Sequence, residues 1–193
     1  GASSNPCDST YRGPAAASEV ETQAVQTFMQ TIFEDQRGPE REDAAPEDTT
    51  GVFITLHSYG NLVLWPWGDT YSAAPNDAQL RQLGRKFAAF NSYTAQQASD
   101  LYPTSGATDD WSYGDLGIAS YTFEIGSSRD GFYPGCHRYD ALIEPNLRAF
   151  FYAAKVARTP YQLPYGPSVS AVRVPTATIQ IGDQVHIRAT VDD

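Results

Sequence analysis

The fold is decided around residues 52–59, which read Val-Phe-Ile-Thr-Leu-His-Ser-Tyr. An apolar, β-branched run predicts a strand over Val52–Leu56, buried on both faces of a mostly parallel sheet. The strand delivers His57 at its end, followed by Ser58 and Tyr59. A strand end holds a side chain rigidly beside an open loop, which suits a metal ligand. A histidine in this place is more often a hydrogen-bonded structural residue, so both interpretations stay open at this point.

Helical periodicity predicts the first helix, over residues 18–34. Its apolar side chains, expected to be buried, are Val20, Ala24, Val25, Phe28 and Ile32. Ser18 and Glu21 have the spacing of a capping box, which would satisfy the first amide groups of the helix. The acidic stretch Glu34–Thr50 follows. It predicts an exposed loop, because it contains prolines and lacks an apolar anchor.

The alternation of strands and helices continues beyond this loop. A second apolar run spans residues 61–67, and Asn76 can cap a following helix. The run 118–125 predicts another buried strand, which delivers Glu124, and Pro145 suits the first turn of a further helix. The side chains expected to be buried in these two helices are Leu80, Leu83, Phe87, Phe90, Leu147, Phe150, Phe151 and Ala154. The pattern predicts an α/β fold, with a mixed, mostly parallel sheet and helices on both faces.

The character of the sequence changes after residue 160. The proline-rich stretch 161–167 predicts a linker, and alternating runs within 168–193 predict a hairpin around Gly182-Asp183. This hairpin resembles the first strands of a small β-sandwich. We therefore expect one body over residues 1–160 and the truncated start of a β domain, which is too short to bury a core alone.

Charge and composition exclude several classes of partner. The chain has 193 residues and a net charge of −10, which disfavours nucleic acid and anionic membrane surfaces. No apolar run approaches the roughly 20 residues of a membrane span. The two cysteines, Cys7 and Cys136, permit one disulfide, two free thiols or two bridges to segments outside these residues. A low lysine content is typical of an extracellular, secreted protein, and so is the position of the cysteines in predicted loops.

Three segments carry a resemblance to a known family. They are GASSNPCDSTYRGPAAASEVE at residues 1–21, FITLHSYGNLVLWPWG at 53–68 and LYPTSGATDDWSYGDLGIASYTFE at 101–124. In this order they resemble the M14 zinc carboxypeptidases, the carboxypeptidase A/B family, over about residues 1–160. The family's first zinc motif, His-x-x-Glu, and its Asn-Arg pair would lie upstream of Gly1. The resemblance implies the C-terminal half of a catalytic domain, and it implies that Cys7 pairs with a cysteine upstream.

The resemblance also implies a role for several residues. His57 would be the third zinc ligand, with two ligands supplied from upstream, and Glu124 would be the general base. Tyr102 matches the family's mobile tyrosine, which closes over the terminal carboxylate of the substrate. Ser58 and Tyr59 match residues that line the substrate cleft. Hydrogen bonds that fix the loop around His57 are an equally ordinary role for these two residues.

The two carboxylates also have interpretations from their surroundings. Glu124 ends an apolar run, so poor solvation would raise its pKa, and an ion pair with an arginine is the alternative. Asp109 falls where the family places the residue at the base of its side-chain pocket. An aspartate there goes with substrates that end in lysine or arginine, because a buried carboxylate attracts a cation. Ala107 and Thr108 would line the same pocket.

The sequence thus predicts a secreted zinc metallocarboxypeptidase with Zn²⁺ as its cofactor. It would hydrolyse the C-terminal peptide bond of peptides or proteins, with a preference for Lys or Arg, or for a mixture of basic and apolar C-terminal residues. One alternative is a non-catalytic, secreted, peptide-binding relative. The other is an inactive fragment of an active enzyme, because the first zinc motif and the Asn-Arg pair are absent from these residues.

Overall fold

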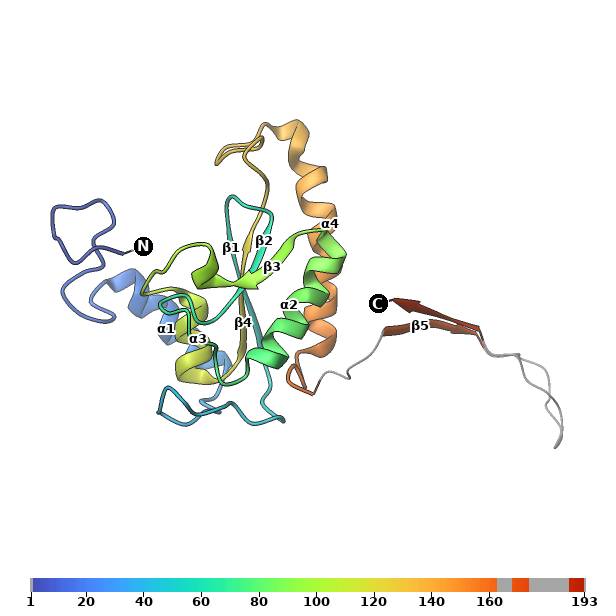
Figure 1. Cartoon of the computed structure of the whole chain (residues 1–193), viewed down its shortest axis with the longest axis horizontal. Helices are drawn as coiled ribbons and strands as arrows, with labels where there is room; N and C mark the ends of the chain where they lie inside the picture. Colours follow the sequence, from blue (N-terminus) through green and yellow to red (C-terminus); the bar gives the residue numbers. More distant parts are fainter. Residues whose placement is uncertain (1, 163–167, 174–187, 193) are drawn as a thin grey trace. The chain divides into compact units, whose positions relative to one another are not determined.

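A computed structural model of the chain describes residues 2–162, 168–173 and 188–192. The chain divides into two compact units, Gly1–Leu163 and Pro164–Asp193. The first unit holds a sheet with helices, and the second holds a small sheet of its own (Figure 1).

The first unit is built on a four-stranded sheet with the strand order β1-β4-β2-β3. Its strands are β1 (Val52–His57), β2 (Leu62–Trp65), β3 (Thr94–Gln97) and β4 (Ala119–Glu124). β1 runs parallel to β4 and β2 runs parallel to β3, whereas β2 and β4 are antiparallel. The prediction of a mixed, mostly parallel sheet is confirmed.

Helices cover both faces of this sheet, as predicted. They are α1 (Val20–Ile32), α2 (Asp77–Asn91), α3 (Thr108–Leu116) and α4 (Tyr139–Val156), with 3-10 turns at Ala98–Asp100 and Cys136–Arg138. Strand β4 shows the division, because successive side chains of a strand point to opposite faces. Tyr121 packs edge-on against Phe87 of α2 at 5.1 Å between ring centroids. The next side chain, Thr122, hydrogen-bonds Asp109 of α3.

The main core lies between the sheet and helices α2 and α4. Among its buried side chains are Val63, Trp65, Leu80, Leu83, Phe87, Tyr121, Phe123, Ala149 and Ala153. The predicted positions Leu80, Leu83 and Phe87 are fully buried. Each such side chain contributes about 1.5–3 kcal/mol to the free energy of unfolding, so this face holds the unit together.

Strand β1 lies at an edge of the sheet. In the described part of the chain its one sheet partner is β4, and Val52–Thr55 are half-buried. Leu56 is 55% exposed. Val52 and Ile54 pack on the main core and Phe53 on the smaller cluster with Met29 and Leu116, so both faces are covered, as predicted. The strand is nevertheless only half-buried, because no described element pairs with its outer edge. That edge presents unpaired amide and carbonyl groups.

Helix α1 is shorter than the predicted span 18–34, and its apolar face is exposed. The exposed side chains are Val20, Val25, Phe28 and Ile32, while Met29 is buried. The predicted capping box does not form: Ser18 donates its hydroxyl hydrogen bond to Glu19 at 2.8 Å, and Glu19 precedes the helix without capping it. The periodicity found the helix but not the face it buries, because no described segment packs on the apolar side.

Helix α4 begins at Tyr139, so Pro145 lies inside the helix and not in its first turn. A proline there removes one helical hydrogen bond. The side chains that α4 buries are Asn146, Ala149 and Ala153. Phe150 is half-buried, whereas Leu147, Phe151 and Ala154 are exposed. The prediction chose the large side chains, but the helix turns small ones inward, where they allow α2 to approach closely.

The acidic segment Glu34–Thr50 contains no helix or strand, as expected, but it is not simply exposed. Arg37, Ala45 and Thr49 are buried. Asn76 precedes α2 without capping it, because its side-chain amide exchanges hydrogen bonds of 2.7 and 3.0 Å with the backbone of Ala45. These bonds fix the segment to the body of the unit.

The second unit shows the strands β5 (Ser168–Arg173) and β6 (Arg188–Asp192), which pair antiparallel. The predicted turn at Gly182-Asp183 lies outside the described residues. The linker at 161–167 and the β-sandwich stay predictions.

The cysteines and the question of a membrane span concern the chain as a whole. Cys7 and Cys136 are both exposed, free thiols, so they do not bridge each other in this structure.

In the part of the chain that the structure describes, none of the helices has the length and apolar character that crossing a bilayer requires.

Candidate active site

The sheet brings the two central candidate residues together. β1 and β4 are parallel, and their register pairs His57 with Glu124 at the carboxyl ends of both strands. The amide of Ile125 donates a hydrogen bond of 2.8 Å to the carbonyl oxygen of His57, which extends the pairing past the last residues. Two residues that lie far apart in the sequence therefore share one rigid edge.

Glu124 is a poorly solvated carboxylate. It is 8% exposed, and burial raises the pKa of its carboxyl above the usual value, while the nearby His57 opposes this shift. Among the described residues no arginine or lysine forms an ion pair with it. The poor solvation and raised pKa expected from the sequence are thus present, and the arginine partner of the alternative is not seen among the described residues, while the role of Glu124 as a base stays a prediction.

Asp109 enters the site from α3. It is 1% exposed and lies in the first turn of this helix. Its carboxylate accepts a hydrogen bond of 3.0 Å from the Thr122 hydroxyl and one of 3.1 Å from the backbone amide of Asp110. Burial raises its pKa, and these hydrogen bonds oppose the rise. Asp109 is thus a buried carboxyl group that forms no ion pair with a lysine or arginine in the described part of the chain.

A cavity of about 160 Å³ joins these groups. Its lining contains His57, Leu64, Ala98, Leu101, Tyr102, Thr104, Gly106, Ala107, Thr108, Asp109, Thr122 and Glu124. Four of the predicted site residues therefore lie around one hollow, and Ala107 and Thr108 line it as predicted. Tyr102 is 52% exposed, on the segment that leads into α3.

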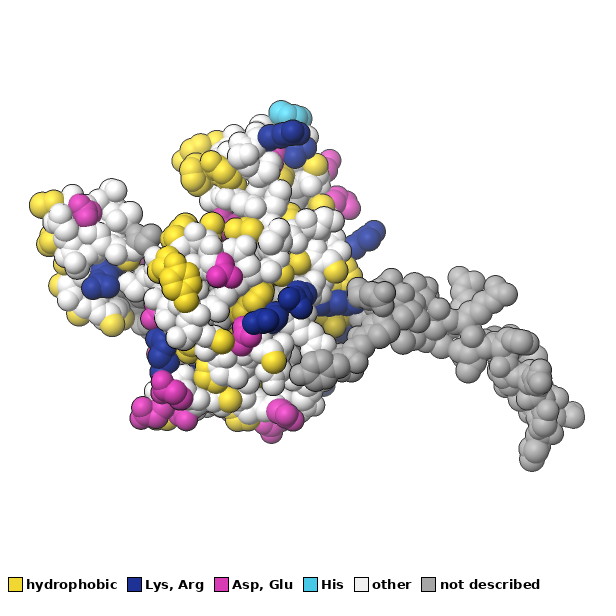
Figure 2. Space-filling view, in the orientation of Figure 1, with side chains coloured by type: hydrophobic (Ala, Val, Ile, Leu, Met, Phe, Trp, Pro, Cys, Tyr) yellow, Lys and Arg dark blue, Asp and Glu magenta, His cyan; other side chains and the backbone are white. Residues whose placement is uncertain are grey.

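Ser58 and Tyr59 lie elsewhere. Both are exposed, they follow β1 directly, and neither is part of the lining of this cavity. The ring of Tyr59 packs against Phe132 at 4.9 Å between centroids. Phe132 and its neighbour Tyr133 are exposed on the loop that joins β4 to α4. Figure 2 shows hydrophobic side chains on this loop, at the top of the molecule.

Sequence reasoning missed Thr122, which holds Asp109 in place. Its signal was present, because Ser120, Thr122 and Glu124 alternate along an otherwise apolar strand and therefore share one face. Phe132 was also missed, and its sequence context of glycine, proline and tyrosine gave no sign that it would meet Tyr59.

A zinc ion needs three protein ligands and an open position in a hydrolytic site. His57 is exposed at a strand end and can supply an imidazole nitrogen. The described residues contain no group of three His, Cys, Asp or Glu side chains that could hold a metal ion. His57 therefore fits zinc as a single ligand, and the described residues do not form a complete zinc site.

Comparison with known sequences identifies the family. The sequence profile described as zinc carboxypeptidase matches residues 1–148. The chain belongs to the zinc carboxypeptidase family. It is similar to human carboxypeptidase B, with 34% identity over 163 residues, which cover 80% of the chain and 36% of that protein. It is also similar to the zinc carboxypeptidase of Saccharothrix mutabilis subsp. capreolus, with 48% identity over 89 residues, which cover 42% of the chain and 20% of that protein.

A solved structure confirms the fold. Bovine thrombin-activatable fibrinolysis inhibitor, solved in complex with tick carboxypeptidase inhibitor, superimposes with a TM-score of 0.67 and 27% identity. The match covers 81% of this chain and 51% of that one. Human carboxypeptidase O, 33% identical over 190 residues, is matched over 94% of this chain and 46% of its own length. The matches thus cover between 20% and 51% of the length of these longer relatives.

Proposed function

We propose that this zinc carboxypeptidase chain forms one half of an active site that hydrolyses the C-terminal peptide bond of peptides or proteins. The observation that supports this most strongly is the pairing of His57 with Glu124 at one edge of the sheet, beside a cavity that Tyr102 and Asp109 also line. Two further zinc ligands and the groups that bind the substrate's terminal carboxylate would come from outside these residues.

His57 and Glu124 would have distinct roles in hydrolysis. His57 would hold the zinc ion, which when bound lowers the pKa of a water and polarises the scissile carbonyl. Glu124 would accept a proton from the attacking water and deliver it to the departing amine. Its poor solvation supports this role, because a raised pKa brings a carboxyl group closer to the working range of a base.

Tyr102 and Asp109 would bind the substrate. Tyr102 is exposed on a loop that walls the cavity, so it can reach a bound peptide. Asp109 lies buried in the same lining without an ion pair to lysine or arginine among the described residues, and a basic side chain entering the cavity would supply one. We therefore propose a preference for basic C-terminal residues. We also propose that Ser58 and Tyr59 contact the substrate, with the ring of Tyr59 packed against Phe132.

We further propose that the protein acts outside the cell. The low lysine content, with Lys86 and Lys155 as its two lysines, supports this proposal. Secretion can be tested by locating the protein in cell and medium fractions of its source organism; retention in the cell fraction would contradict it.

The experiment that tests the function compares this chain with a version extended at its amino-terminal end. Zinc content and hydrolysis of a peptide that ends in arginine are measured on both. We expect zinc and activity together in the extended version alone. Stoichiometric zinc in the extended version without hydrolysis would favour the non-catalytic, peptide-binding alternative.

A further inference from the structure

We propose that Asp110 is a positioning residue that holds the Tyr102 loop, residues 98–107, in place through the backbone of the loop after β2. This inference rests on the proposed function in one respect, namely that Tyr102 contacts the substrate. The chain of contacts itself is independent of that role. It runs from Asp110 to Gly68 and from Gly68 to Thr104.

The first link is the carboxylate of Asp110. It lies in the first turn of α3 and accepts hydrogen bonds from the amide of Gly68 at 2.7 and 3.0 Å, one to each oxygen. It accepts a third, of 3.2 Å, from the amide of Asp69. Two consecutive backbone amides are thus bound by one side chain, which fixes the orientation of the peptide group between them.

The second link joins this backbone to the Tyr102 loop. The carbonyl oxygen of Gly68 accepts a hydrogen bond of 2.9 Å from the amide of Thr104, two residues after Tyr102. The carbonyl oxygen of Trp67 accepts hydrogen bonds from the Gln97 side chain at 3.0 Å and from the Ser99 amide at 3.4 Å. The loop therefore rests on the backbone that Asp110 holds.

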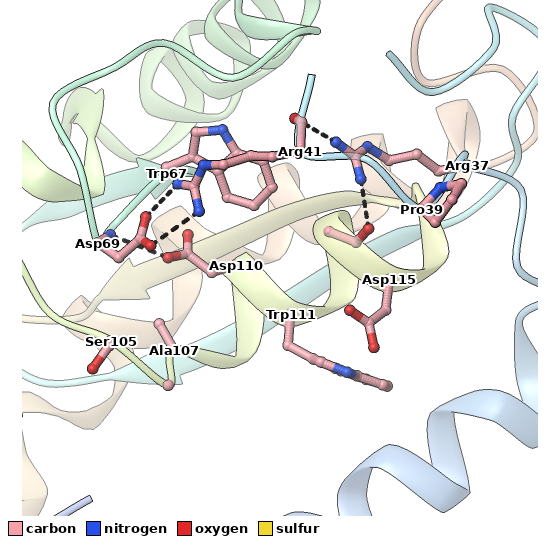
Figure 3. Close-up of a pocket in the computed structure, with 12 residues that line it drawn as sticks. Arg37, Pro39, Arg41, Trp67, Asp69, Ser105, Ala107, Asp110, Trp111 and Asp115 are labelled. Atoms are coloured by element: carbon pink, nitrogen blue, oxygen red, sulfur yellow. Dashed lines mark hydrogen bonds and ion pairs between the residues drawn. The ribbon is translucent and has the colours of Figure 1, made fainter. Parts of the chain in front are cut away.

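A third contact, made by Arg41, supports the backbone of residues 67–69. Arg41 forms a bidentate ion pair with Asp69, and its guanidinium lies over the ring of Trp67 at 4.4 Å from the centroid. Figure 3 shows the Arg41 guanidinium beside the Trp67 ring, with both Arg41 and Asp110 joined to Asp69. Residues 67–69 are thus held between the Glu34–Thr50 segment and α3.

The charges around Asp110 indicate what holds it. Asp109 comes from its own helix, Asp69 from the loop after β2 and Arg41 from the Glu34–Thr50 segment, while Arg37 and Asp115 line the same hollow. The carboxylates of Asp109 and Asp69 both disfavour a negative charge on Asp110. The amide hydrogen bonds are therefore the main favourable contacts of the Asp110 carboxylate, and their loss should release the loop.

Asp110 is not a lining residue of the cavity that contains His57 and Glu124. Its effect on a bound peptide must therefore pass through Thr104 and the rest of the loop. If Asp110 positions the loop, its removal should increase backbone motion in the loop segments alone. If it supports the whole fold, the increase should extend through the first unit. Removal of the carboxylate should free residues 66–72 and 98–107 and leave the β4 strand unchanged.

Hydrogen–deuterium exchange of the full chain, followed by mass spectrometry, tests this directly. In Asp110→Ala we expect peptides that cover 66–72 and 98–107 to exchange at least about tenfold faster than in the unchanged protein. Asp110→Asn keeps one acceptor oxygen and should restore part of the protection. Asp115→Asn removes a carboxylate from the same helix and hollow, and it should leave both peptides unchanged.

Two results would overturn the inference. One is unchanged exchange at 98–107 in Asp110→Ala. The other is a parallel increase throughout the first unit, including β4, which would mean that Asp110 supports the whole fold and not this loop.

Kinetics of the extended, active version separate this inference from the proposed function. Asp110→Ala should raise KM at least about tenfold, with a smaller change in kcat, because a loosened Tyr102 binds the peptide less well. A loosened loop with an unchanged KM would support the anchor and would count against Tyr102 as a substrate contact. Failure of the Asp110 anchor and failure of Tyr102 as a substrate contact therefore give different results.

Discussion

Glu124 ends a buried strand, and at the level of single residues its surroundings are what make it a candidate base. Its carboxylate is shielded from water and lies next to His57. Glu124→Gln preserves shape but removes the proton acceptor. We expect kcat of the extended version to fall by about 10²–10⁴-fold, with zinc content unchanged, because general-base catalysis has this magnitude. Initial rates on a peptide that ends in arginine measure kcat, and metal analysis measures the zinc content.

The matched control for this substitution is Glu144→Gln. Glu144 is an exposed carboxylate on α4, away from the cavity lining. It should leave kcat and zinc content as they are. Activity that survives in Glu124→Gln would remove Glu124 from the mechanism.

Asp109 is the residue expected to select the substrate. Asp109→Asn keeps an acceptor for Thr122 but loses the negative charge. We expect kcat/KM for a peptide that ends in arginine to fall about 10–100-fold more than for one that ends in phenylalanine, since charged hydrogen bonds contribute about 1.5–3 kcal/mol. Parallel assays of the two peptides at low salt give the ratio. If the ratio is the same in both proteins, Asp109 does not select the substrate.

At the level of elements, the packing of α3 against the loop after β2 should make stability depend on pH. Burial, together with the charge of Asp109, raises the pKa of Asp110 from 3.8 to about 7. A carboxyl with a raised folded-state pKa stabilises the fold below its unfolded pKa, and this contribution is lost as the pH rises toward the folded value. The melting temperature should therefore fall between about pH 4 and pH 7.

Asp110→Asn should flatten this fall, because the side chain no longer titrates. Asp109 and Glu124 have raised pKa values too, so part of the slope should remain. Asp130 works in the opposite direction: the hydrogen bond from Arg138 lowers its pKa, and its contribution is lost only in strong acid. Calorimetric scans at several pH values measure the slopes. An identical slope in Asp110→Asn would contradict the assignment.

Elements with a clear apolar pattern could be predicted from the sequence. Strands β1 and β4 were found because each lies in a short, continuous run of mostly apolar residues, and helix α2 because its buried side chains recur at helical spacing. β3 reads Thr-Ala-Gln-Gln and was missed, since it forms by pairing with β2 and not by burying apolar side chains. α3 was also missed, because it buries Asp109 and Ser112 beside Tyr113 and therefore lacks an apolar stripe.

The candidate site, too, could be predicted from the sequence only in part. The sequence and its family resemblance indicated His57, Tyr102, Asp109 and Glu124, which the fold brings to one cavity. They could not indicate that Asp110 binds the amides of Gly68 and Asp69, about forty residues away in the sequence. Contacts between side chains and distant backbone follow from tertiary packing and leave no local pattern.

At the level of the whole chain, exposed apolar surface is the main feature. The α1 face formed by Val20, Val25, Phe28 and Ile32 is exposed, and β1 has an unpaired edge in the described residues. We expect the chain to self-associate on its own, because both features favour contact with another surface. Sedimentation velocity over a range of concentrations measures this. A monomeric chain that melts cooperatively would contradict it.

A matched pair of substitutions tests the α1 face separately. Phe28→Glu places a charge within this face, where the side chain is 64% exposed. Gln30→Glu adds the same charge to the same helix outside it, at another exposed position. The first should reduce self-association and leave the melting temperature within a few degrees, whereas the second should change neither. Equal effects of the two would mean that net charge, and not this face, controls association.

The central claim is that His57 and Glu124 belong to a zinc site that the described residues only partly form. The most direct measurement is the zinc content of the purified chain, of the amino-terminally extended version and of its His57→Ala variant, after dialysis against a weak chelator. We predict stoichiometric zinc in the extended version alone. Tight, stoichiometric zinc in the chain by itself, or zinc retained in His57→Ala, would contradict the claim.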